Sequence, residues 1–162
     1  MSETAYERFD DRAGFQAAVD RLLLAQPGRE LRAFDPDGAA LMLNDPARIE
    51  RIERFLLASR TRRLYLVLHE TDHVTRHCPR MMALLARFAH AIQIHRTHQE
   101  IRELQDAFLV LDSQHYVRRA SAAFFRGAIG LGDETEGQVM RARFMEIWAQ
   151  SFPAISSTTA GL

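Results

Sequence analysis

The sequence predicts a mixed α/β fold, in which a largely parallel sheet is flanked by helices. The uninterrupted apolar run over residues 64–68 is typical of a strand that is covered on both faces. Helical and strand-like patterns alternate around this run, so residues 31–94 indicate a β-α-β-α-β order with right-handed crossovers. A strand–turn–strand pattern over residues 107–119 adds an antiparallel hairpin and makes the sheet mixed.

The chain divides into a helical lead-in, a main domain and a tail. Apolar residues recur at helical spacing over residues 15–23, and Gly28 ends that helix. The last residues are rich in Ser and Thr and lack periodic apolar positions. We therefore assign residues 1–29 to the helical lead-in, residues 30–152 to the α/β domain and residues 153–162 to a flexible tail.

The first strand and helix of the main domain have clear boundaries. Residues 31–34 form a short apolar-containing run, and the Pro and Gly of residues 35–38 indicate a turn after it. Asp45 is placed to cap a helix with Pro46 in its first turn. We expect this helix to end near Ser59.

After the central apolar run the pattern continues with a second helix and a third strand. Pro79 begins the helix, and residues 92–94 alternate as a strand. Thr97 and Glu100 have the spacing of a capping box, which predicts a short helix that ends near Leu104.

A hairpin and a long helix complete the domain. Residues 107–111 and 116–119 are the two strands of the hairpin, with residues 112–115 as the turn. A glycine-containing loop then leads to a helix with an apolar face. That face carries Met140, Phe144, Ile147 and Trp148.

The charges of the chain restrict its partners and its chemistry. The 21 basic residues balance the 21 acidic ones, so no overall field attracts the chain to nucleic acid or to an anionic membrane. Any anion site must be local. All basic residues are Arg, which excludes lysine Schiff-base chemistry and the lysine of a phosphate-binding P-loop.

The cysteine content and the hydropathy of the chain indicate a cytoplasmic protein. Cys78 is the single cysteine, which excludes an internal disulfide and fits a reducing compartment. Residues 1–11 are polar and carry no apolar signal region. No stretch approaches the roughly 18 uncharged apolar residues of a membrane span, so we expect no membrane association.

The stretch from Gln105 to Asp112 resembles a catalytic motif, His-x-Lys-x4-Asp, in which the spacing matches on the aspartate. Here Gln105 stands at the histidine position and Ala107 at the lysine position. Residues 132–134 and 144–148 match the acidic loop and the Phe-x-x-x-Trp closing helix of the same proteins. Together with the order of elements, these motifs make the chain resemble one half of a phospholipase D-type protein, of the HKD superfamily.

This resemblance implies the fold but not the activity. In the superfamily an imidazole attacks phosphorus, and Lys and Asn donors stabilise the phosphate oxygens. An amide and a methyl group do neither, so we expect a pseudo-enzyme in which Asp112 shapes the hairpin turn through Asx-type hydrogen bonds. A residual, non-catalytic pocket would be built from Gln105, Ala107, Asp112, Arg118, Arg119 and Glu134.

The resemblance also implies a partner. Two halves pack side by side in the superfamily with the active site at their junction, so a lone half is expected to form a two-fold homodimer with a binding or scaffolding role. The chain further resembles a proteobacterial domain family that occurs alone or beside an acetyltransferase domain. An acetyltransferase or another protein is therefore the alternative partner.

A metal-dependent hydrolase is an alternative from a different class. The string His69-Glu70-Thr71-Asp72-His73 matches H-E-x-x-H, in which two histidines one helical turn apart bind zinc and the glutamate polarises water. His77 follows as a further candidate ligand. However, the motif begins where the strand over residues 64–68 ends, which favours a polar loop between strand and helix.

Binding of phosphate or of a nucleic-acid backbone through arginines is the remaining alternative. Guanidinium groups match phosphate oxygens, and they cluster at residues 60–63 and at Arg118, Arg119 and Arg126. The first cluster is also expected on structural grounds, because cations are favoured at the C-terminus of a helix. The histidines at positions 90, 95 and 98 are expected to be scattered over the surface.

Overall fold

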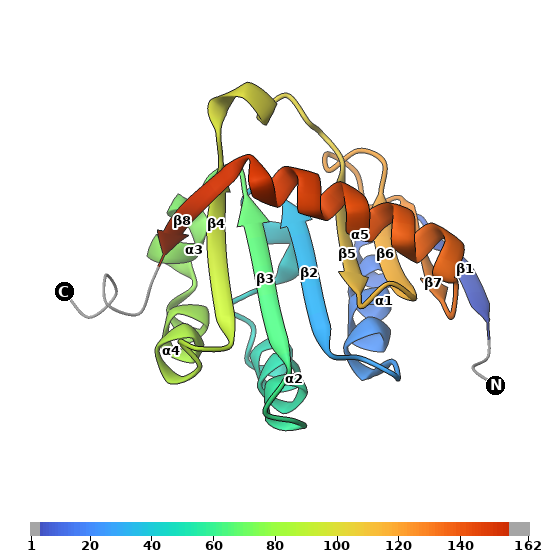
Figure 1. Cartoon of the computed structure of the whole chain (residues 1–162), viewed down its shortest axis with the longest axis horizontal. Coiled ribbons are helices and arrows are strands. Elements are labelled where there is room, and N and C mark those ends of the chain that lie inside the picture. Colours follow the sequence, from blue (N-terminus) through green and yellow to red (C-terminus); the bar gives the residue numbers. More distant parts are fainter. Residues whose placement is uncertain (1–3, 156–162) are drawn as a thin grey trace.

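The computed structural model describes residues 4–155, which contain one eight-stranded sheet with helices on both faces (Figure 1). The strand order is β1-β7-β6-β5-β2-β3-β4-β8. The strands are β1 (Ala5–Phe9), β2 (Glu30–Asp35), β3 (Arg63–Leu68), β4 (Ile92–Thr97), β5 (Ala107–Leu111), β6 (His115–Arg119), β7 (Gly127–Leu131) and β8 (Ser151–Ile155). The helices are α1 (Arg12–Leu24), α2 (Pro46–Leu57), α3 (Asp72–His77), α4 (Pro79–Arg87) and α5 (Glu134–Ala149), with 3-10 turns η1 (Ala39–Leu41) and η2 (Gln99–Ile101).

The mixed α/β class is confirmed, but most strand pairs are antiparallel. β3 pairs in parallel with β2 and β4, and every other pair in the described sheet is antiparallel. β5 returns beside β2, so that Leu31 is opposite Leu111, and short turns then lead through β6 and β7. The sheet is therefore less parallel than expected, because the parallel core gains an antiparallel meander on one side and β8 on the other.

The two faces of the sheet are covered by different helices. Figure 1 shows α1, α2 and α4 behind the sheet and α5 crossing its front. Leu66 belongs to the core on the first face, whereas the next residue, Val67, packs with Phe144 of α5 in the core on the second face. Burial on both faces explains why the β3 sequence is apolar without alternation.

Several helix boundaries confirm the sequence-based prediction. The Asp45 carboxylate accepts a hydrogen bond from the Arg48 N–H at 3.1 Å, and Pro46 is the first residue of α2. Pro79 is the first residue of α4. No helix within residues 4–155 is long and apolar enough to span a membrane.

The structure also differs from the predicted elements at three places. β1 pairs with β7 although it precedes the first predicted element, because its polar residues are exposed and hide the strand pattern. β8 includes residues 153–155 of the predicted flexible tail, and the remainder of that tail lies outside the described residues. Thr97 is the last residue of β4 and caps no helix, since its hydroxyl lies 2.8 Å from His69 Nδ1.

The helical lead-in packs on the sheet. Phe15 and Leu22 of α1 are almost completely buried in the same core as Leu66 of β3. The Asp11 carboxylate caps α1 by accepting a hydrogen bond from the Gly14 N–H at 2.7 Å. Phe15 also contacts Phe9 of β1, with ring centroids 5.7 Å apart, so this helix connects β1 to the core of the sheet. Figure 1 shows α1 at the end of the sheet where β1 lies.

Candidate anion-binding groove

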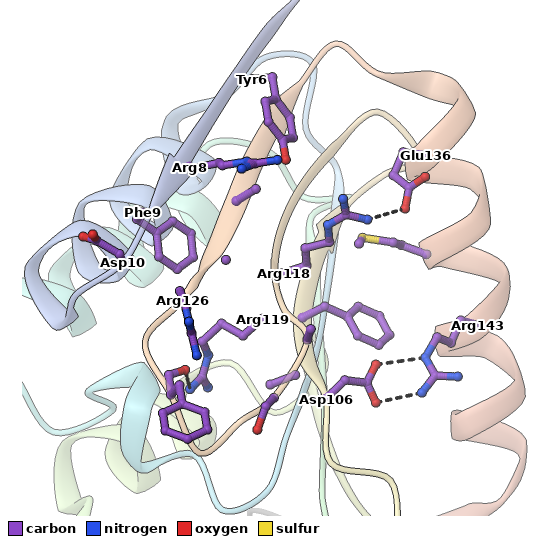
Figure 2. A pocket seen from close by; sticks show the side chains of 18 of the residues that line it. Tyr6, Arg8, Phe9, Asp10, Asp106, Arg118, Arg119, Arg126, Glu136 and Arg143 are labelled. Atoms are coloured by element: carbon purple, nitrogen blue, oxygen red, sulfur yellow. Dashed lines mark hydrogen bonds and ion pairs between the residues drawn. The ribbon is translucent and has the colours of Figure 1, made fainter.

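An open groove of about 980 Å³ lies between α5 and β1, over the strands β5, β6 and β7 (Figure 2). Its most frequent side chain is arginine, and five of them come from separate parts of the chain. They are Arg8, Arg118, Arg119, Arg126 and Arg143.

Cross-strand register places two of these arginines on the floor of the groove. Arg8 of β1 and Arg118 of β6 are both opposite Ala128 of β7, and Arg118 is also opposite Phe108 of β5. Directly opposed residues in a sheet project from the same face. The small side chain of Ala128 therefore leaves space between two guanidinium groups.

Tyr6 lies beside this pair of arginines (Figure 2). It is two residues before Arg8, so both side chains project from the same face of β1. Hydrogen bonding from Arg8, with a smaller contribution from Arg118, lowers the pKa of the Tyr6 phenol below its ordinary value. Both arginines thus act as donors toward an oxygen at this edge of the groove.

Carboxylates neutralise two of the arginines on the α5 side. Arg118 donates to Glu136 at 2.7 Å, and Arg143 makes a two-pronged contact with Asp106 at 2.7 and 3.1 Å (Figure 2). Arg8 and Arg126 form no ion pair with any residue that the structure describes. These two guanidinium groups are the ones most available to an external anion.

A buried ion pair supports the inner end of the groove. Arg119 donates to Asp35 at 2.9 Å, and both side chains are at most 3% exposed. Phe15 and Phe125 flank the guanidinium, with ring centroids 4.6 and 5.4 Å from its central carbon. Burial raises the pKa of the Asp35 carboxyl and lowers the pKa of the Arg119 guanidinium, each against the attraction of the other.

Arg119 also holds the loop that borders the groove. Its guanidinium donates to the carbonyl oxygens of Ala122 and Phe124 at 3.0 and 3.3 Å. The loop in turn carries Arg126, whose guanidinium lies 5.5 Å from the Phe124 ring centroid. Arg119 is therefore a structural part of the site, whereas Arg126 faces its opening.

The structure brings some of the predicted site residues together here. Ala107, Arg118 and Arg119 line the groove, and the carbonyl of Gln105 accepts a hydrogen bond from the Ala122 N–H beside it. Glu134 is exposed in the first turn of α5, and Glu136 lines the groove in its place.

Asp112 lies at the opposite end of β5. Its Oδ1 atom accepts hydrogen bonds from the backbone N–H groups of Arg29 and Glu30, both at 2.9 Å. Its backbone has φ of 55°, a left-handed conformation that Asp tolerates better than most residues. The expected Asx-type hydrogen bonds within the turn are therefore wrong, because the carboxylate bonds to the start of β2, which lies beside β5.

The three candidate zinc ligands do not form one cluster. His69 follows β3 and is buried; its Nε2 atom donates to the Leu104 carbonyl at 2.8 Å, so Nδ1 accepts from the Thr97 hydroxyl. His73 and His77 lie on α3 with ring centroids 5.6 Å apart. Within residues 4–155, no group of three or more His, Cys, Asp or Glu side chains is placed to hold a metal ion.

Glu70, the acidic residue of the H-E-x-x-H match, forms ion pairs with two arginines. It pairs with Arg96 at 2.9 Å and with Arg102 at 3.7 Å.

His95, which was expected on the surface, is only 9% exposed and stacks on Trp148 at a centroid distance of 3.6 Å. The expected scatter of exposed histidines is therefore wrong for His95, because the Trp148 ring of α5 covers it.

Sequence reasoning missed part of the groove. Tyr6, Arg8, Asp106 and Arg143 were not singled out, because nothing local in the sequence pairs β1 with β7 or places α5 beside β5. The alternation of Tyr6 and Arg8 is the sequence feature that could have indicated strand β1, but it extends over too few residues to predict a strand.

Comparison with known proteins identifies both a family and a fold. The model of a family described as Domain of unknown function (DUF7931) matches residues 11–157. Among curated proteins, none is similar to the chain in sequence. Four solved structures that are similar to the chain are 12% identical to it or less, so they establish the fold alone.

Three solved structures illustrate the similarity. TrmBL2, an archaeal chromatin protein with a novel mode of DNA binding, has a TM-score of 0.67 and 11% identity, over 93% of this chain and 55% of its own. Nuc from Salmonella typhimurium, a phospholipase D family member, has a TM-score of 0.65 and 12% identity, over 95% and 100%. Phosphatidylserine synthase from Haemophilus influenzae Rd KW20 has a TM-score of 0.55 and 10% identity, over 97% and 41%.

These coverages give the extent of the similarity. The chain spans the whole of Nuc, but only about half of TrmBL2 and less than half of the synthase. The expected phospholipase D-like fold is confirmed by Nuc and by NucT from Helicobacter pylori, which has a TM-score of 0.63.

Proposed function

Since the chain belongs to the family described as Domain of unknown function (DUF7931) and has a phospholipase D-like fold, we propose that it binds a phosphate-bearing ligand without cleaving it. The observation that carries this proposal is the groove between α5 and β1. Its lining contains five arginines, while Ala107 occupies the position of the catalytic lysine.

The residues at the motif positions argue against catalysis. The superfamily mechanism needs an imidazole to attack phosphorus and a cation to stabilise the developing charge. Gln105 offers an amide, Ala107 offers a methyl group, and Asp112 bonds to backbone N–H groups at the far end of β5. With these groups the groove keeps a recognition surface and lacks a nucleophile at the motif position.

The arginines support recognition of phosphate. A guanidinium presents paired N–H donors that match two phosphate oxygens. Arg8 and Arg126 are exposed and carry no carboxylate partner within the described part of the chain. TrmBL2, which shares the fold, binds DNA, and a nucleic-acid backbone is one ligand that offers such phosphates.

Binding of a short fluorescent DNA oligonucleotide, followed by anisotropy at several salt concentrations, tests the proposal. We expect the Arg8→Gln/Arg126→Gln variant to bind about tenfold more weakly and to lose about two units of salt slope, because two phosphate contacts disappear. The matched control, Arg54→Gln/Arg87→Gln, removes two exposed arginines that pair with Glu50 and Glu53 on α2. Equal binding by both variants would rule out the groove as the site.

Incubation with a chromogenic phosphodiester tests the absence of cleavage. We expect no turnover above the buffer rate, because arginines that hold the phosphate oxygens do not break the phosphodiester bond when the site lacks a nucleophile. Turnover that disappears in Gln105→Ala, with the fold retained by circular dichroism, would overturn the non-catalytic assignment.

The same groove supports the proposal of a homodimer. Three of the residues that line it have large, exposed side chains: Tyr6, Phe124 and Val139 are 55, 56 and 59% exposed. Apolar side chains gathered around a groove of this size are typical of an interaction surface. In a two-fold dimer these side chains would pack against the second copy, and the two grooves would lie at the junction with their arginines open to a ligand.

A further inference from the structure

A second arginine cluster lies at the other end of the sheet from the groove. Its hollow, of about 570 Å³, is lined by the segments that precede β2 and β3, by the β5–β6 turn and by α5. Four arginines contribute to it, and none of them belongs to the groove described above. They are Arg29, Arg32, Arg62 and Arg141.

The close approach of α5 to the β5–β6 turn brings Arg141 to this hollow. At Gly137 a Cβ atom would lie only 2.2 Å from the Ser113 carbonyl oxygen, so only a glycine lets the helix and the turn meet. Arg141 is four residues further along α5, on the same side of the helix. It therefore extends over the region where β2 begins.

Arg32 forms a fixed positive charge at the bottom of the hollow. Its side chain is only 6% exposed, and its guanidinium lies 5.2 Å from the Tyr65 ring centroid. The guanidinium also donates to Glu30 at 2.7 Å, which holds it in one orientation. A buried guanidinium held by an aromatic ring and a carboxylate loses little freedom when it binds an anion.

The remaining arginines leave an excess of positive charge. Within residues 4–155, Arg29, Arg62 and Arg141 form no ion pair. Asp112 also lines the hollow, but its Oδ1 atom already accepts two backbone N–H groups. The hydroxyls of Ser59 and Thr61, which lie 3.0 Å from each other, add further donors at the rim.

We propose that this hollow binds a small ligand that carries two or more phosphate groups. Four arginines from β2, its preceding residue, the segment before β3 and α5 line the hollow, and the Arg62 guanidinium also packs 4.7 Å from the Phe55 ring centroid. Their combined charge suits several oxyanion charges better than one. A volume of about 570 Å³ exceeds what a single phosphate needs, and hydroxyl donors complement phosphate oxygens. This site is separate from the groove, so it does not depend on the function proposed above.

Titration calorimetry with inorganic pyrophosphate tests this proposal on the full chain. We expect the Arg29→Gln/Arg141→Gln variant to bind pyrophosphate at least about tenfold more weakly than the natural sequence. Both side chains are exposed, so their replacement leaves the core intact. The control variant Arg54→Gln/Arg87→Gln is expected to bind as tightly as the natural sequence.

Further arms of the experiment distinguish this hollow from the groove and from a general affinity for anions. The groove variant Arg8→Gln/Arg126→Gln is expected to keep the pyrophosphate site that the Arg29→Gln/Arg141→Gln variant weakens, and to lose only a second pyrophosphate that binds in the groove. Citrate is expected to bind more weakly than pyrophosphate, because its carboxylates are less densely charged. Absence of pyrophosphate binding, equal binding by the Arg29→Gln/Arg141→Gln variant, or a preference for citrate would each overturn the proposal.

Discussion

His95 illustrates at the scale of one residue how burial determines what a histidine does. Its ring stacks on Trp148 with an angle of 16° between the planes, and its Nδ1 atom lies 2.8 Å from the Ser151 hydroxyl oxygen. The loss of solvent lowers the pKa of His95 below its ordinary value of 6.5. The folded protein therefore favours the neutral ring.

This shift predicts a dependence of stability on pH. Below the ordinary value of 6.5 the unfolded chain binds a proton that the folded His95 resists, so the free energy of unfolding falls as the pH decreases through that window. We expect His95→Phe, which keeps an aromatic ring against Trp148, to flatten this decrease in urea unfolding between about pH 7.5 and 5. The exposed His90→Gln is the control, and an unchanged slope in His95→Phe would contradict the prediction.

The Asp35–Arg119 pair predicts a large effect of a single substitution. Arg119→Met leaves the Asp35 carboxylate buried without its cation, and we expect a loss of about 3 to 5 kcal/mol in the free energy of unfolding. Asp35→Asn/Arg119→Met is expected to be more stable than Arg119→Met, because no buried charge remains and the Gly38 N–H keeps its acceptor. Thermal and urea unfolding of both variants measure this; a double variant no more stable than Arg119→Met would contradict it.

At the scale of elements, Asp112 joins two strands that are distant in sequence. Its carboxylate connects the β5–β6 turn to the start of β2, where β2 and β5 pair. We expect Asp112→Ala to lower the free energy of unfolding by about 1 to 3 kcal/mol, because two N–H groups lose their acceptor. Asp112→Asn keeps an acceptor oxygen and tolerates the left-handed backbone, so we expect a smaller loss in the same urea titration.

Elements with a strong local pattern were predicted well. The cap at Asp45, the proline that begins α4 and the hairpin β5–β6 are all recognisable from a few neighbouring residues. The strands β1 and β8 were missed because they lie at the two edges of the sheet and leave most of their side chains exposed or half-buried. An edge strand has little apolar alternation, so its sequence resembles that of a loop.

At the scale of the whole molecule, the groove predicts self-association. We expect sedimentation equilibrium at high micromolar concentration to give the mass of a two-fold dimer, since Tyr6, Phe124 and Val139 present exposed apolar surface. Val139→Arg places a charge in that surface and is expected to shift the equilibrium toward the monomer. The exposed Met145→Arg, on another side of the same helix and outside the groove, is the control, and a monomeric mass for the natural sequence would contradict the prediction.

The sequence by itself determined the fold class and most of the elements. These features depend on residue identity and on the local periods of 2 and 3.6 residues, which any single chain displays. Only the tertiary structure decided that Arg8 and Arg118 share a groove, that Asp35 pairs with Arg119 and that Arg32 and Arg141 line one hollow. Those contacts join segments that are far apart in the chain, and strand register and helix packing, which no local pattern encodes, bring them together.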